Sequence, residues 1–97
     1  MFEFIEKENK LSCMFSGQMD TQTCMDMEKI LKEAIKEGIS LVVFDLKDVE
    51  YVCSLFLGIC VQTSKRASSK DFLIINVQPS VKKLFKISGL DKIINVQ

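Results

Sequence analysis

The stretch Leu41-Val42-Val43-Phe44 is a continuous apolar run. A run of this kind is typical of a buried strand that is covered on both of its faces. A second run, Phe72-Leu73-Ile74-Ile75, repeats the pattern. Between the two runs, a helix is predicted from about Leu55 to about Ala67, and its first half is apolar almost all round. Buried strands that alternate with helices predict parallel strands at the centre of an α/β fold.

Toward the N-terminus, two strands are predicted to form a hairpin. Phe2 and Phe4 alternate with Glu3, and an alternating segment from Leu11 to Ser16 follows a turn at residues 7–10. A helix then follows, with Asp20, Thr21 and Thr23 as candidates to cap its start. Its apolar face consists of Cys24, Met27, Leu31, Ala34 and Ile35, and Gly38 is expected to end it.

Toward the C-terminus, a third helix and a last strand are predicted. Pro79 is placed in the first turn of this helix, where a missing N–H costs nothing, and Gly89 is placed at its end. The helix takes its apolar stripe from Val81, Leu84 and Phe85, and the last short strand is expected at Ile93, Ile94 and Val96. The predicted order is β-β-α-β-α-β-α-β, in one α/β domain over residues 1–97. We expect a mixed sheet with parallel central strands and helices packed on it.

Composition limits the function. The 97 residues carry 13 basic and 13 acidic side chains, so the chain has no broad attraction for nucleic acid. It contains no histidine, the usual general base and commonest metal ligand. The apolar runs are far shorter than the ~20 residues of a membrane span, and the start does not read as a secretory signal. These features predict a cytoplasmic protein that does not insert directly into a membrane.

The four cysteines are expected to be free thiols. Cys13, Cys24, Cys53 and Cys60 form no C-x-x-C pair and no zinc-like spacing, so no metal or cofactor is expected. In a reducing cytosol they are predicted to be mostly buried as small hydrophobic side chains. Cys53 lies beside Ser54, but no histidine is present to activate either as a nucleophile. No catalytic residue is therefore predicted.

Four segments resemble the STAS domains of anti-sigma-factor antagonists. Ser16-Gly17-Gln18-Met19-Asp20 resembles the family's G-x-[IL]-D turn, and Phe44-Asp45-Leu46-Lys47-Asp48-Val49 resembles its strand-ending D-L-x-x-V segment. Cys53-Ser54-Leu55-Phe56-Leu57-Gly58 falls where the family carries D-S-[ST]-G-L-G. The segment from Pro79 to Leu90 resembles its P-x-V-x-x-[LM]-[FL]-x-x-[ST]-G-L tail.

The resemblance implies a regulatory protein-binding switch in bacterial signalling. Members of this family bind a serine kinase that doubles as an anti-sigma factor, and so free the sigma factor for transcription. Phosphorylation of the first serine in the D-S motif releases the kinase, and a serine phosphatase resets the switch. Ser54 corresponds to that serine. A phosphate at a helix start can be held by free N–H groups and by the helix dipole, whereas the alternative role for Ser54 is an ordinary helix cap.

The candidate partner-binding residues are Asp20, Cys53, Ser54, Leu55 and Phe56. Asp20 matches the family aspartate beside the switch, and its alternative role is to cap the first helix. Cys53 replaces the family's aspartate, and Leu55 and Phe56 replace its small residue and glycine. Phe56 is predicted either to fold into the core or to form an exposed apolar patch with Leu55 for a partner.

The departures from the family motif also favour an alternative function. In that alternative, the chain is a docking module that binds constitutively, without phosphorylation, as a transporter subunit or a signalling scaffold.

Overall fold

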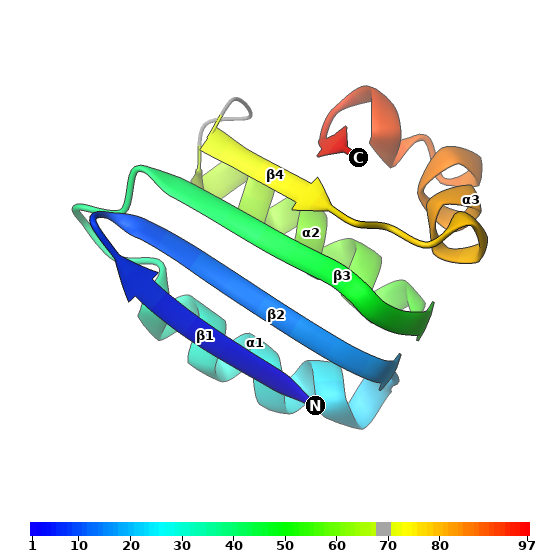
Figure 1. Ribbon diagram of the computed structural model, residues 1–97, viewed down its shortest axis with the longest axis horizontal. Coiled ribbons are helices and arrows are strands. Elements are labelled where there is room, and N and C mark those ends of the chain that lie inside the picture. The colour runs from blue at the N-terminus through cyan, green and yellow to red at the C-terminus, as the bar shows by residue number, and fades with distance from the viewer. Residues whose placement is uncertain (68–70) are drawn as a thin grey trace.

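A computed structural model describes residues 1–67 and 71–97 (Figure 1). The strands are β1 (Phe2–Lys7), β2 (Lys10–Met19), β3 (Leu41–Val52), β4 (Phe72–Ile75) and β5 (Asn95–Val96). The α-helices are α1 (Thr21–Ala34), α2 (Ser54–Arg66) and α3 (Pro79–Ile87), and a 3-10 turn, η2, spans Leu90–Lys92. This order of elements confirms the predicted β-β-α-β-α-β-α-β arrangement.

The strands form one mixed sheet in the order β1-β2-β3-β4-β5. β1 runs antiparallel to β2, and every other neighbouring pair is parallel. The hairpin turns at Glu8 and Asn9, which both have positive φ, as the favoured two-residue hairpin turns require. The last strand is shorter than predicted. Ile93 and Ile94 precede it, since the 3-10 turn delays the chain's return to the sheet.

One face of the sheet carries α1 and α2 side by side (Figure 1). Val42 and Phe44 lie on this face, within the hydrophobic core. Val43 points to the opposite face, as alternation along a strand requires. It is nevertheless only 6% exposed, because Ser12 and Leu73 flank it in register. The prediction of a strand covered on both faces is therefore confirmed at Val43, where side chains of the neighbouring strands flank it on the second face.

β3 runs eight residues beyond the apolar stretch that predicted it. Its pairing with β2 shifts register twice, between Met14 and Ser16 and between Gly17 and Gln18, as β-bulges do. Each shift places an extra residue in β3. Leu46, Val49 and Val52, which are spaced by three rather than two, are consequently all buried.

The ends of the outer helices match the prediction only in part. Pro79 is the first residue of α3, and Gly89 adopts a left-handed conformation just after its end, as predicted. Gly38 also has positive φ, but α1 already ends at Ala34. The Arg66 guanidinium of α2 donates hydrogen bonds to the carbonyls of Lys32 and Ile35, at 3.3 and 2.9 Å. The last turn of α1 is thus satisfied by a side chain from α2, so it does not need a glycine there.

Candidate functional site

Two helices start next to each other at one edge of the sheet. The parallel strands β2 and β3 end at Met19 and Val52, which are partners in register. Asp20 follows the first strand and Cys53 the second, and each is the N-cap of a helix. The backbone N–H of Cys53 donates to the Met19 carbonyl at 3.1 Å, which ties the two chain turns together. The residues that the sequence singled out therefore gather at this edge.

Asp20 caps α1. Its Oδ1 accepts a hydrogen bond from the backbone N–H of Thr23 at 2.9 Å, which confirms the capping role. This bond is the chief reason that the pKa of Asp20 is lowered below its ordinary value, and a side-chain hydrogen bond from Thr23 adds to it. The carboxylate is exposed and ionised near neutral pH. It therefore fixes the start of α1 and leaves a negative charge at the surface.

Ser54 is the first residue of α2, and it is exposed. This confirms its predicted place in the first turn of the second helix. Its alternative role as the helix cap is wrong, because Cys53 occupies the N-cap position. The first turn of α2 consists of uncharged residues. Its backbone N–H groups lack partners within the helix, so this end can favour an added negative charge.

Phe56 lies in the core, and its side chain is 0% exposed. Its ring centroid lies 5.4 Å from that of Phe15 and 6.1 Å from that of Phe44. Leu55 is half-buried and packs against the same core. The predicted alternative of an exposed apolar patch formed by these two residues is therefore wrong, and Phe56 cannot contact a partner directly. Because its ring turns inward, it also leaves Ser54 uncovered.

Behind the site lies a pair of thiols whose contact was not predicted from the sequence. Cys53 Sγ lies 3.8 Å from Cys24 Sγ, and Cys24 Sγ donates to the Met19 carbonyl at 3.6 Å. Cys53 is half-buried, whereas Cys24 is buried. Burial raises the pKa of the Cys24 thiol to about 12, with the hydrogen bond from Cys53 adding to the effect. The sequence places each cysteine at the start of a helix that follows a strand, but their contact depends on the pairing of β2 with β3.

The other two thiols behave as predicted. Cys13 and Cys60 are buried, and within the described residues all four cysteines are free. Burial raises the pKa of the Cys13 thiol to about 12 and that of Cys60 well above its ordinary value. Both therefore remain protonated near neutral pH and pack as small apolar groups.

An exposed aromatic side chain at this edge was also missed. Tyr51 is 48% exposed and lies three residues before Ser54. It faces outward because the second bulge of β3 changes the alternation just before it. Exposed tyrosines are enriched where proteins bind one another. Tyr51 therefore joins Ser54 and Asp20 as a candidate contact residue.

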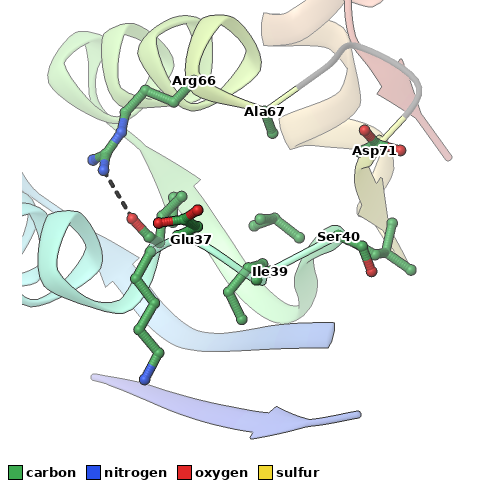
Figure 2. A pocket seen from close by; sticks show the side chains of 11 residues that line it. Glu37, Ile39, Ser40, Arg66, Ala67 and Asp71 are labelled. Atoms are coloured by element: carbon green, nitrogen blue, oxygen red, sulfur yellow. Dashed lines mark hydrogen bonds between the residues drawn. The ribbon is translucent and has the colours of Figure 1, made fainter. Parts of the chain in front are cut away.

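A separate hollow lies at the opposite end of the helices (Figure 2). It measures about 370 Å³ and lies between the loop after α1 and the end of α2. Arg66, which lines this hollow, points to the end of α1, where its guanidinium donates a hydrogen bond to the Ile35 carbonyl (Figure 2). The hollow is therefore distant from Ser54 along both helices, and Arg66 in its wall already has a structural role.

Neither a metal centre nor a membrane span is found in the part of the chain that the structure describes. Within residues 1–67 and 71–97, no group of three or more acidic or cysteine side chains is arranged to hold a metal ion. No helix among these residues is long and apolar enough to cross a membrane.

The sequence of the chain is similar to that of known proteins. The family model of the STAS domain matches residues 2–97. Two relatives, each named anti-sigma-B factor antagonist, are 29% identical to the chain. The one from Staphylococcus aureus covers 82% of this chain and 76% of the relative, and the one from Staphylococcus epidermidis covers 97% and 89%.

Solved structures with a similar fold include proteins named as anti-sigma factor antagonists. The unphosphorylated anti-sigma factor antagonist SpoIIAA gives a TM-score of 0.85 at 15% identity, covering 100% of this chain and 88% of that one. The phosphorylated form of Bacillus SpoIIAA gives 0.77 at 15% identity, covering 100% and 91%. An anti-sigma factor antagonist from Mycobacterium paratuberculosis gives 0.87 at 21% identity, covering 99% and 83%.

Proposed function

This chain belongs to the STAS-domain family, and on that premise we propose that it is an anti-sigma-factor antagonist controlled by phosphorylation of Ser54. Its partner is a serine kinase that is also an anti-sigma factor, and a serine phosphatase removes the phosphate. The observation that carries the proposal is the exposure of Ser54 as the first residue of α2, beside the start of α1.

A phosphate at Ser54 is compatible with the fold. It would add about −1.5 to −2 charges at pH 7. At the start of α2 this charge meets the free N–H groups and the positive end of the helix dipole, in a first turn of uncharged residues. The helix therefore tolerates the modification, and the effect falls on the surface that a partner contacts.

The same charge weakens the fit of a partner that binds the unmodified surface. Asp20 already places an exposed carboxylate at the neighbouring helix start. A phosphate at Ser54 makes this edge more negative without a change of fold, and desolvating that charge opposes binding. The added negative charge at the start of α2 is therefore enough to explain release of the partner, without a change of fold.

The departures from the family motif leave this surface accessible. The bulky Phe56 is directed into the core, and Leu55 packs against it. The remaining difference is Cys53, which stands in the N-cap position where the family carries aspartate. The relatives named anti-sigma-B factor antagonist and the fold shared with SpoIIAA support the assignment.

Cys53 also favours a second candidate function, docking without phosphorylation. A kinase that recognises the family's carboxylate beside the acceptor serine would lose that contact here. In this candidate function, the same edge binds a transporter subunit or a scaffold permanently.

Phosphorylation in the native host separates the two functions. We expect intact-mass and peptide spectra of the native protein to show a phosphate on Ser54 in some growth states. Incubation with ATP and the kinase-type anti-sigma factor of the same genome should modify wild type and Ser80→Ala, but not Ser54→Ala. Ser80 is the matched control, because it is exposed in the first turn of α3. A native chain that is never phosphorylated, or a phosphate on another residue, would contradict the proposal.

A further inference from the structure

We propose that Cys24 and Cys53 are a redox modification site, at which hydrogen peroxide produces a reversible disulfide between the starts of α1 and α2. This inference concerns the two thiols alone and does not depend on the partner or on phosphorylation. It rests on three features of the site: the proximity of the sulfur atoms, the unequal exposure of the two thiols, and the backbone anchor that they share.

The sulfur atoms are already in contact. They lie 3.8 Å apart, although 29 residues separate them in the sequence. A disulfide bond is about 2.05 Å long, so the sulfurs need to approach by roughly 1.8 Å. The Cys53 side chain makes no capping hydrogen bond with any residue that the structure describes, so its rotation toward Cys24 breaks no helix cap.

The backbone around the pair is fixed at one point. The Met19 carbonyl accepts from Cys24 Sγ at 3.6 Å and from the backbone N–H of Cys53 at 3.1 Å. The two cysteines are therefore held to the same residue at the end of β2. Bond formation removes the S–H donor of Cys24, but the backbone N–H of Cys53 still donates to the Met19 carbonyl, so the start of α2 stays tied to the end of β2.

The two thiols differ in exposure, and this difference determines which of them reacts first with peroxide. Cys53 is half-buried and can be reached from solvent, whereas Cys24 is buried behind it. Peroxide therefore reacts first at Cys53, and Cys24 acts as the resolving thiol. Burial holds the pKa of Cys24 at about 12, so its thiolate is scarce near neutral pH and the second step is expected to accelerate as pH rises.

The chemistry is balanced with one peroxide. The Cys53 thiolate attacks one oxygen of hydrogen peroxide, the O–O bond breaks, and the departing hydroxide becomes water by taking a proton. Cys53 is then a sulfenic acid. The Cys24 thiolate attacks the Cys53 sulfur, an S–S bond forms and the S–O bond breaks, and the second hydroxide also becomes water. Two thiols and one peroxide yield one disulfide and two waters.

The disulfide would join the first turns of two helices. Cys24 lies in the fourth position of α1, and Cys53 is the N-cap of α2, directly before Ser54. Such a bond closes a loop of 29 residue steps, which restrains the unfolded chain. In a reducing cytosol it would be transient, because thiols reduce it once the oxidant is gone.

The test is peroxide treatment of the folded wild-type chain, followed by thiol counting and peptide mapping. We expect the count of free thiols to fall from four to two in a monomer, and dithiothreitol to restore all four. Cleavage after Asp20 separates Cys13 from Cys24, and fragmentation between Leu55 and Gly58 separates Cys53 from Cys60. The expected cross-link joins the Cys24 peptide to Cys53, and the oxidised monomer should melt at a higher temperature.

Variants make the assignment specific. Cys53→Ser, which keeps a side chain suited to an N-cap, should lose no thiol pair to peroxide, and Cys60→Ala should still form the bond. Cys60 is the relevant rival, because its pKa is raised in part by the nearby Cys24, but it is fully buried. A Cys24–Cys60 bond, a dimer linked through Cys53, or oxidation of Cys53 to sulfinic acid without any disulfide would each overturn the proposal.

Discussion

The rings of Phe15 on β2 and Phe56 on α2 meet edge to face, with centroids 5.4 Å apart and planes at 89°. Phe44 on β3 completes the contact, with its centroid 5.0 Å from that of Phe15. Aromatic pairs with this geometry contribute about 0.5–1.5 kcal/mol beyond their buried area. The helix that carries Ser54 is therefore attached to the sheet by an aromatic cluster directly beneath its first turn.

Phe56→Ala is expected to lower the free energy of unfolding by about 3–5 kcal/mol, the usual cost of removing a buried phenylalanine ring. Phe56→Lys should unfold the chain or nearly so, because a charged group would enter the core. Urea denaturation measures both effects. Phe2→Ala is the control: Phe2 is half-buried on the edge strand β1, so its loss should cost much less. Equal, small losses for both residues would show that Phe56 is not a core residue.

Asp20 is expected to make stability depend on acidity. Its folded pKa lies below its ordinary value of 3.8, so its contribution is present above that value and is lost as pH falls through the folded pKa. Asp20→Asn keeps an acceptor for the Thr23 N–H but cannot titrate. The difference in melting temperature between wild type and Asp20→Asn should stay constant above about pH 5 and shrink in stronger acid. A difference that grows on acidification would contradict this account.

Cys53→Ser is expected to stabilise the start of α2. The N-cap backbone is already extended, but the thiol makes no capping hydrogen bond to any described residue. A serine oxygen can accept from an N–H of the first turn, and we expect a gain of about 0.5–1 kcal/mol. Chemical denaturation of the reduced protein measures it. A loss of stability instead would show that packing against Cys24 outweighs the cap.

Arg66→Ala is expected to loosen the end of α1, because it removes the donor to the carbonyls of Lys32 and Ile35. The side chain is exposed, so the expected cost is only about 0.5–1 kcal/mol. Hydrogen exchange should be faster in the last turn of α1 and unchanged at its first turn. Arg66→Lys should recover little of the loss, because an ammonium lacks the planar fork that reaches two acceptors. Full recovery by lysine would contradict the capping role.

Hydrophobic pattern alone predicted the order of the elements but not the full length of β3. The continuous apolar run ends at Phe44 because the charged Asp45 follows it. The bulges opposite β2 change the phase, so Leu46, Val49 and Val52 still reach the core. A bulge depends on how two strands pair, and a single strand's sequence does not contain that information.

Some features of the site could be predicted from local sequence, whereas others depend on tertiary packing. Asp20 and Ser54 could be placed at helix starts because capping and first-turn patterns are local. Phe56 could not be assigned to the core or the surface, since its burial depends on the space between Phe15 and Phe44. The contact between Cys24 and Cys53 likewise arises from the register of β2 with β3.

The most direct test of the Ser54 switch is the affinity for the kinase-type anti-sigma factor of the same genome, measured by calorimetry without ATP. We expect Ser54→Asp to weaken binding by about tenfold or more, whereas Ser54→Ala and the control Ser80→Asp should bind like wild type. The reason is that only the first of these places charge at the start of α2. Equal affinity for all four proteins would contradict control at Ser54 and leave constitutive docking as the function.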